Sequence, residues 1–459
     1  MSHKQSWAAV ALVLVFAMVI GGYAPVAASA PAQTAVVSST VPVTTSGAVT
    51  STAPMTSTGA VTSTVPMTST GAVTSTVPVT ATTTQTTTSG APFVFGVILV
   101  GPYNDHGWSE ANYDAGQYAE AKIPGAKMVY VDNVNPASKP GVTVPQVVDS
   151  LISQGAKIVF ATSDDFQDGA LEAAKAHPDL PIVEESGDQA WKDGQNYQAP
   201  PNESNFMGRA EYSKMIGGCA AALTTQTGKI GFLGPLINDE TRRLADAAFL
   251  GARYCWQTYA KKDPSKLQFK VTWIGYWFNI PGQTLDPTKV ADDFFNNGYD
   301  VVMSGIDTTE ALVEAGKMTQ AGKKVWAVPY DFKDACAEAP SVCLGVPYYN
   351  WGPAYVKAIQ MVQNNQWTQF WNWNGPDWSD YDNADTSNVG FAFGDALSAD
   401  TKATLQTLMT GMGNGSIVLF KGPLNYQDGS VYLKDGQIPT DQQIWYMPQL
   451  LQGMVGQSK

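Results

Sequence analysis

Three side chains that can bind a small molecule stand between an apolar run and a helical pattern. Asn104, Asp105 and Trp108 follow the β-branched run Phe93–Val100 and lead into Ser109–Lys122, which has small and aromatic residues at helical spacing. The segment therefore predicts strand, loop and helix. In an open α/β sheet the loops that leave the carboxyl ends of the strands line the ligand crevice. A carboxylate there can fix polar hydrogens and an indole can cover a flat ring, so this loop is a candidate ligand site.

Each of these side chains also has a purely structural interpretation. The carboxylate of Asp105 is suited to a turn in which it accepts hydrogen bonds from its own backbone. For Trp108 the alternative is an anchor that fixes the start of the helix on the core. Asp164 and Asp165 follow the apolar run Lys157–Ala161, where one carboxylate would cap the next helix. The competing role, assigned here to Asp164, is to line the ligand site.

The motifs of catalytic and metal sites are missing from the sequence. It contains no Gly-x-Ser-x-Gly elbow and no Cys-x-x-Cys, and His106 and His177 have no partner at a ligand spacing. Gly228 and Lys229 resemble part of a phosphate-binding loop, but the other residues of that motif are absent. We therefore expect no enzyme, no cofactor and no metal site.

The charge balance limits the class of partner. The chain has 459 residues and a formal net charge of -13, and its isoelectric point is near 4.7. Nucleic acids and anionic lipid headgroups require a cationic surface, so we expect neither as a partner. The sequence contains 13 Trp and 19 Tyr, which leave material for an aromatic-lined pocket that binds a small molecule.

The N-terminal part of the chain has a composition that cannot form a packed core. Residues 1–30 combine a short basic start with the apolar run Trp7–Ile20 and small residues up to Ala30. This pattern predicts a secretory signal peptide, with retention as a membrane anchor as the alternative. Residues 31–91 are rich in Ser, Thr and Pro, and part of them repeats every twelve residues from Ala48. We expect an extended or disordered stalk, either O-glycosylated or unmodified.

Strand and helix patterns alternate from residue 92 onwards. Such alternation implies right-handed βαβ crossovers and parallel sheets covered by helices on both faces. Two series of similar order predict an α/β fold of two Rossmann-like lobes joined by several hinge strands. We expect lobe 1 to contain residues 92–205 and a return after residue 331, and lobe 2 to contain residues 206–331 and part of the C-terminal region.

Further elements are expected in the second half of the folded part. A strand is expected at Phe269–Tyr276 in lobe 2, directly before a cluster of aromatic residues. Residues 367–388 are aromatic but have no periodicity, which predicts irregular structure. A helix is expected at Ala399–Met412, followed by a hairpin from Ile417 to Leu433.

The four cysteines fit an oxidising compartment. Cys336 and Cys343 lie seven residues apart in one loop, and Cys219 and Cys255 lie on consecutive predicted helices of lobe 2. Of the three formal connectivities, these two pairs require the least rearrangement of the chain. The alternative is four buried thiols.

Five segments resemble, in the same order, the basic membrane protein family of ABC-transporter substrate-binding proteins, which includes purine- and nucleoside-binding lipoproteins. The loop at Asp105 matches the loop after the family's first strand. The others are AKIVFATSDDF from Ala156, TGKIGFLG from Thr227, DVVMSGIDTTEALVEAG from Asp300 and VWAVPYD from Val325. The resemblance covers the chain from residue 93 onwards. It implies a type I periplasmic-binding-protein fold, with a ligand held between two lobes and no catalysis.

The resemblance also implies roles for particular residues. Trp108 would stack on the ring of the ligand, and Trp277 would close the stack from the other lobe, with Phe278 as its competitor. Backbone N–H groups at Gly305 and the hydroxyl of Thr308 would meet sugar oxygens at a helix start.

The predicted hinge departs from the family pattern. Asp331 keeps only the second carboxylate of the family's Gly-Val-Asp-x-Asp, and Tyr348 or Tyr349 stands where the family often has a lysine. Asp331 remains a candidate ligand contact. The two losses weaken the case for ribose-type contacts and favour a flatter or less polar ligand.

Together these features predict a secreted or surface-tethered substrate-binding protein of an ABC importer. We expect a monomer that captures a small aromatic polar solute, such as a nucleoside or purine, by lobe closure and passes it to a membrane permease. The alternative is a stalked surface sensor or carbohydrate-binding protein without a transport role, whose aromatic C-terminal third would stack on sugars. A permease and an ATPase encoded nearby would distinguish the two.

Overall fold

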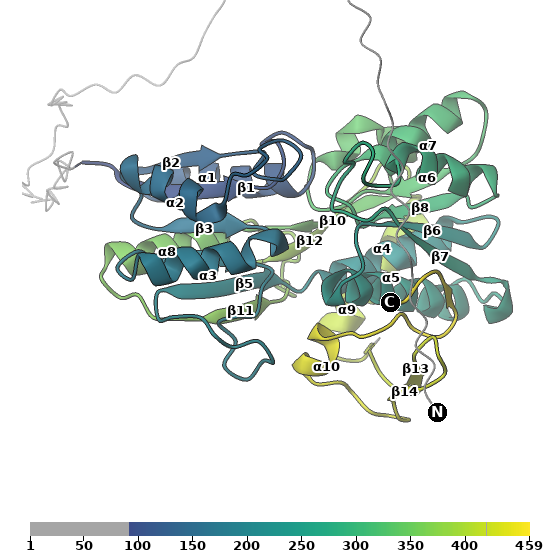
Figure 1. Ribbon diagram of the computed structural model, residues 1–459. Helices are drawn as coiled ribbons and strands as arrows, with labels where there is room; N and C mark the ends of the chain where they lie inside the picture. The colour runs from purple at the N-terminus through teal and green to yellow at the C-terminus, as the bar shows by residue number, and fades with distance from the viewer. Residues whose placement is uncertain (1–90, 419) are drawn as a thin grey trace, which may run out of the picture. The chain divides into compact units, whose positions relative to one another are not determined.

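The computed structural model describes residues 91–418 and 420–459. The predicted signal segment lies outside this part of the chain, as does the predicted stalk up to residue 90. In the described part, parallel strands form two separate sheets, and helices cover each of them (Figure 1). The fold is α/β with two lobes, as the sequence predicts.

Lobe 1 is built on a six-stranded parallel sheet with the order β11-β5-β4-β3-β1-β2. Right-handed crossovers place α1 (Trp108–Lys122) on one face and α2 (Val144–Ser153) with α3 (Gln167–Ala176) on the other. Helix α8 (Gly352–Gln363) packs beside α1. The strands are β1 (Phe93–Leu99), β2 (Ala126–Val131), β3 (Val159–Thr162), β4 (Ile182–Glu185), β5 (Glu203–Gly208) and β11 (Trp371–Asn374).

Lobe 2 repeats this plan on a five-stranded parallel sheet with the order β15-β7-β6-β8-β9. Helices α4 (Ala210–Thr224) and α5 (Asp239–Thr258) pack together, as do α6 (Pro287–Asn296) and α7 (Glu310–Gln320). A capping box between Asn238 and Thr241 starts α5. The strands are β6 (Lys229–Gly234), β7 (Gln268–Trp273), β8 (Val301–Ser304), β9 (Trp326–Val328) and β15 (Met454–Val455).

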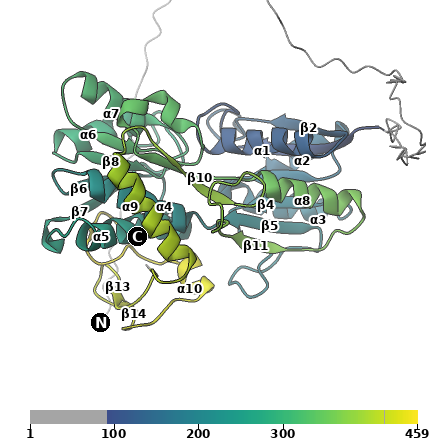
Figure 2. The same cartoon turned by 180° about the vertical axis from the view of Figure 1, so that it is seen from behind.

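Two antiparallel strands run from one lobe into the other. They are β10 (Gly345–Tyr349) and β12 (Val389–Phe393), and Figures 1 and 2 show β10 between the two sheets. Val346 of β10 belongs to an apolar core of lobe 2, whereas Tyr349 belongs to the core of lobe 1. A third passage leads from β5 directly into α4. Hinge strands of this kind let two rigid lobes move relative to each other.

The segment after β12 packs mainly on lobe 2 and returns to lobe 1 at one point. Helix α9 (Ala399–Gly413) contacts α4, and a short hairpin follows from β13 (Leu424–Asn425) and β14 (Val431–Leu433). Trp445, at the end of α10 (Asp441–Trp445), packs edge-on against Trp371 and Trp373 at the edge of the lobe 1 sheet, with ring centroids 5.1 and 5.0 Å apart. The aromatic rings of this region therefore pack on one another within the fold.

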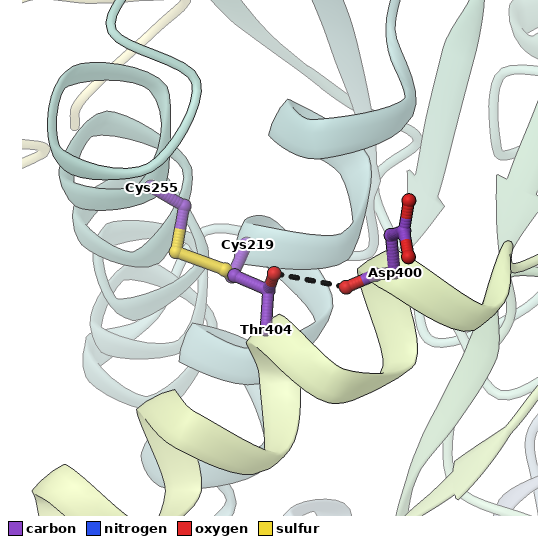
Figure 3. Close-up of a disulfide and its surroundings, with 4 residues drawn as sticks. All are labelled: Cys219, Cys255, Asp400 and Thr404. Atoms are coloured by element: carbon purple, nitrogen blue, oxygen red, sulfur yellow. Dashed lines mark hydrogen bonds between the residues drawn. A yellow bond between two sulfur atoms is a disulfide. The ribbon is translucent and has the colours of Figure 1, made fainter.

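Both predicted cysteine pairs are disulfide-bonded in the structure. The bond between Cys219 and Cys255 joins α4 to α5 beside α9 (Figure 3). The bond between Cys336 and Cys343 closes the short loop that precedes β10. The first lies in the core of lobe 2, where both sulfur-bearing residues are fully buried.

The structure corrects three sequence-based predictions of local structure. Residues 367–388, expected to be irregular, contain β11, which pairs in parallel with β5 at the edge of the lobe 1 sheet. The strand expected at Phe269–Tyr276 ends at Trp273, because its backbone leaves the sheet at Ile274 and Gly275 has a positive φ of 103°. The hairpin expected from Ile417 pairs only from Leu424 to Leu433.

Candidate functional site

The carboxyl ends of the strands of both sheets converge on one pocket. Its lining comes from loops that follow parallel strands and from the first turns of α1 and α5, the positions at which open α/β sheets bind ligands. Both lobes contribute. The lining residues are Trp108, Ser163, Asp164 and Ser186 from lobe 1, and Phe232, Pro235, Glu240, Thr241, Leu244, Trp277, Gly305, Asp307 and Tyr330 from lobe 2.

The two predicted indoles line the same pocket from opposite lobes. Trp108 is 7% exposed, and its Nε1 donates a hydrogen bond to the carbonyl oxygen of Thr162 at 2.7 Å. Its ring packs edge-on against Tyr349 and Trp351. Trp277 is 8% exposed. Trp108 therefore anchors the start of α1 and also presents its ring to the pocket, so the two interpretations of this residue are compatible.

Phe278, the competitor of Trp277, does not line the pocket. Its ring lies edge-on to Tyr276, with ring centroids 5.0 Å apart, and packs against the apolar core of lobe 1. Trp277 rather than Phe278 therefore lines the pocket.

The predicted helix cap at Asp164 or Asp165 is wrong. Ser163 caps the short 3₁₀ turn Asp164–Phe166, and α3 begins after it without a side-chain cap. Asp164 instead lines the pocket and accepts hydrogen bonds from Gln167 and, at 3.3 Å, from Asn238 of lobe 2. Burial, reinforced by the neighbouring Asp165, raises the pKa of Asp164 to about 6.

Asp105 caps the first turn of α1. Its carboxylate accepts hydrogen bonds from the backbone N–H groups of Gly107, Ser109 and Glu110 at 2.9 to 3.0 Å. Burial raises its pKa to about 6 even though these bonds oppose the shift. Asp105 and the exposed Asn104 are not among the pocket lining residues. Ligand contact by these two residues stays a prediction.

The loop after β8 brings lobe 2 into direct contact with lobe 1. Gly305 lines the pocket and lies so close to Phe232 that a Cβ atom would be 2.6 Å from its ring. Across the cleft, a Cβ atom on Gly107 would lie 1.7 Å from the carbonyl oxygen of Asp307, so only glycine fits there. Thr308 bonds to Glu310 and does not line the pocket, so its ligand contact stays a prediction.

The hinge carboxylate Asp331 is fully buried behind the pocket. Its backbone has a positive φ of 70°, and within the described residues neither carboxylate oxygen has a hydrogen-bond partner. Burial raises its pKa well above the usual value, while the charge of Lys214 opposes the shift. Asp331 is not a lining residue, so its ligand contact also stays a prediction.

Lys214 places a buried amino group near the hinge carboxylate Asp331. This fully buried residue of α4 donates from Nζ to the carbonyl oxygen of Ser304 at 2.6 Å and lies over the ring of Tyr330. Burial lowers its pKa well below the usual value. Its position directly before the apolar run MIGGCAAAL gives no sign of a functional role.

Two acidic pocket residues were missed by the sequence reasoning. Glu240 lies in the first turn of α5, where an acidic residue is usual because it complements the helix dipole. Asp307 lies between Gly305 and Thr308, in the segment that resembles the family's ligand loop. The resemblance therefore contains Asp307, although only its neighbours are predicted as ligand contacts. Burial raises the pKa of Glu240 to about 7 and that of Asp307 well above its usual range.

A second, polar pocket adjoins the first and shares Asp164, Ser186 and Glu240 with it. The C-terminal segment forms part of its wall through Trp445 and Tyr446. This segment also contacts both lobes, because Tyr446 donates a hydrogen bond to Asp188 of lobe 1 and the carbonyl oxygen of Met447 accepts one from Arg242 of lobe 2.

Two α/β lobes with hinge strands and a pocket between them form the architecture of the type I periplasmic-binding-protein class. The family model described as "ABC transporter substrate-binding protein PnrA-like" (Bmp) matches residues 93–378. The chain belongs to this family, as the sequence resemblance indicates. Members of the family bind substrates for ABC transporters and are not enzymes.

Individual relatives agree with this assignment. A purine-binding protein of Brucella abortus is 25% identical over 348 residues, which cover 76% of this chain and 88% of the relative. A solute-binding protein of an ABC transporter system from Conexibacter woesei has a similar structure, with a TM-score of 0.51 and 15% identity over 71% of this chain and 98% of that one. Another, from Aeropyrum pernix K1, has a TM-score of 0.55 and 13% identity over 73% and 93%.

In the described part of the chain, each helix is too short or too polar to cross a membrane.

Proposed function

We propose that this protein works outside the cytoplasm, captures a small aromatic polar solute such as a purine or nucleoside, and delivers it to an ABC permease. The observation that carries the proposal is the placement of Trp108 and Trp277, from opposite lobes, in one pocket. Aromatic rings on two sides suit a planar ligand, because stacking is worth about 1–3 kcal/mol per base where it has been measured. The purine-binding relative agrees with this class of ligand.

In this proposal the remaining lining groups select the polar edge of the ligand. Asp164 accepts hydrogen bonds, and the backbone around Gly305 offers groups at the carboxyl end of a strand. Asp105 acts indirectly, because its cap on α1 holds Trp108 in place. A ligand that contacts both lobes lowers the free energy of the closed arrangement, and the permease would recognise that arrangement.

A thermal-shift screen tests the ligand class. The mature chain would be heated with purine bases, nucleosides, sugars and amino acids in turn. A ligand that binds only the folded state, at 100 times its dissociation constant, stabilises it by about 2.7 kcal/mol. We expect purines or nucleosides to raise the melting temperature. A shift with sugars or amino acids alone would contradict the proposal.

Small-angle X-ray scattering tests lobe closure. Addition of a ligand found in the screen should lower the radius of gyration of the chain, because the lobes approach each other around it. An unchanged radius of gyration at saturating ligand would show that binding does not close the lobes.

A further inference from the structure

The charged side chains that line the pocket are all acidic. Among its lining residues are the carboxyl groups of Asp164, Glu240 and Asp307, and no lysine, arginine or histidine is among them. The large rings of Trp108, Phe232, Trp277 and Tyr330 form much of the remaining wall. A ligand for this pocket must therefore satisfy carboxyl groups and aromatic faces together.

Two of these carboxyl groups are buried without a partner in the protein. Glu240 is 7% exposed and Asp307 is 5% exposed, and neither side chain forms a hydrogen bond with another described residue. Burial of a polar group costs free energy unless it is hydrogen-bonded, and burial of a charge costs more unless it is paired. Both groups line the ligand pocket, so the ligand itself is the partner that can satisfy them.

The nearest protein cations, Arg243 and Lys214, lie outside the pocket lining and offset only part of the charge of Glu240. The guanidinium of Arg243 is engaged with Glu211, at 2.7 Å from Nε to Oε1. The ammonium of Lys214 donates to the carbonyl oxygen of Ser304, and burial favours its neutral form. Further carboxyl groups lie behind the lining and act on Asp307 through space, namely those of Asp105, Asp165 and Asp331.

We propose that the natural solute carries a protonated amino group beside its aromatic ring, and that Glu240 and Asp307 bind this cation while Trp108 and Trp277 hold the ring. The inference rests on the proposed function and narrows its class of ligand. Aromatic faces add to the attraction, because their negative quadrupoles bind cations. A metal ion is not the cation in question, since no group of three His, Cys, Asp or Glu side chains in the described residues is arranged to hold one.

A matched pair of ligands tests the charge requirement. The probes are adenosine with a 2-aminoethyl group on N6 and adenosine with a 2-hydroxyethyl group there, which differ in one terminal group and in charge. Isothermal titration calorimetry at pH 7.5 should show at least tenfold tighter binding of the amine, because hydrogen bonds to charged groups are the stronger kind. Binding of the amine should also release protons from the carboxyl groups of the pocket. The binding enthalpy would then differ between buffers of different ionisation enthalpy.

Variants locate the effect. The preference for the amine is the ratio of the dissociation constants of the alcohol and the amine. Glu240→Gln and Asp307→Asn should each reduce this ratio to less than half of its value in the unaltered chain. Glu172→Gln removes a carboxylate from the exposed face of α3 and should leave the preference unchanged. Circular dichroism and melting temperature check that each variant is folded. The comparison of the two ligands on the unaltered chain does not depend on any variant.

The outcomes separate the two proposals. Equal affinity for the amine and the alcohol would overturn the inference and leave the proposed function standing. A preference that survives both Glu240→Gln and Asp307→Asn would also overturn it. Binding of neither compound, together with a thermal shift by sugars or amino acids alone, would overturn the proposed function itself.

Discussion

Trp277 of lobe 2 donates a hydrogen bond from its indole Nε1 to a carboxylate oxygen of Asp165 in lobe 1, at 3.2 Å. The hydroxyl of Tyr276 donates to the other oxygen of the same carboxylate. Trp277 also lines the ligand pocket. Trp277 therefore both contacts the other lobe and lines the pocket. A substitution at Asp165 should thus alter ligand binding through Trp277, without removing a direct contact to the ligand.

Asp165→Ala should weaken ligand binding, mainly through faster dissociation. The substitution removes two hydrogen bonds to a carboxylate that hold the lobes together. Because Asp165 is exposed, we expect a loss of about 1 kcal/mol rather than the larger values of buried charged pairs, which is roughly fivefold in affinity. Stopped-flow tryptophan fluorescence measures the dissociation rate. Asp168→Ala, on the exposed side of α3, is the control, and an equal rate in the two variants would contradict the prediction.

The two indoles should contribute to binding in different ways. Trp277→Ala and Trp108→Ala should each weaken binding by roughly ten- to a hundredfold through loss of stacking. Trp108→Phe should keep much of the affinity, because an aromatic ring remains. It should nevertheless lower the free energy of unfolding by about 1 kcal/mol, because the hydrogen bond to Thr162 is lost.

Titration by fluorescence quenching and urea unfolding measure these two quantities separately. Affinity that survives both alanine substitutions unchanged would show that the indoles serve only the core.

The fold could be read from the sequence because buried parallel strands appear as short apolar runs between helical patterns. Runs such as Phe93–Val100 and Lys229–Leu233 reappear as β1 and β6 with nearly the same bounds. The rule that ligands bind at the carboxyl ends of such strands led to Trp108, and the family resemblance led to Trp277; both line the pocket. Local pattern, general topology and the family resemblance were together sufficient for these features.

Features that depend on contacts distant in the sequence could not be read in this way. Strand β11 exists because Trp371 aligns with Asn205, far away along the chain, and its own residues show no alternation that marks a strand. Lys214 is fully buried, and its position directly before the apolar run MIGGCAAAL gives no hint of the groups around it. Glu240 occupies the first turn of a helix, where an acidic residue is usual. Its place in a pocket lined by both lobes depends on contacts that the local sequence does not show.

The two disulfides should contribute unequally to stability. Non-reducing peptide mapping should find Cys219 linked to Cys255 and Cys336 linked to Cys343, with no thiol open to alkylation in the unfolded, unreduced chain. Replacing the first pair by alanines, which opens a loop of 36 residues, should cost about 4 kcal/mol of unfolding free energy. Replacing the second, with a separation of seven, should cost about 2 kcal/mol. Equal losses in urea unfolding would contradict the loop-length argument.

The pocket should make the ligand-free protein less stable as the pH rises through the weakly acidic range. The pKa of Glu240 is raised from 4.5 to about 7 by burial, with Asp164 and Glu211 adding to the shift and Arg243 and Lys214 opposing it. A carboxyl group whose pKa is higher in the folded state binds its proton more tightly there. Its stabilising contribution is complete below pH 4.5 and is lost as the pH rises to about 7.

Glu240→Gln, which cannot ionise, should therefore flatten this dependence. Between pH 4.5 and pH 7.5 the unaltered chain should lose up to about 3 kcal/mol more unfolding free energy than the variant. This figure follows because one pKa unit corresponds to about 1.4 kcal/mol. Asp105 and Asp164, whose pKa values are each about 6, contribute a pH dependence of the same sign in both proteins. Urea unfolding at a series of pH values measures the difference, with Glu172→Gln as the exposed control. Identical slopes in the Glu240 variant and the unaltered chain would show that this carboxyl group is not held in its neutral form by the pocket.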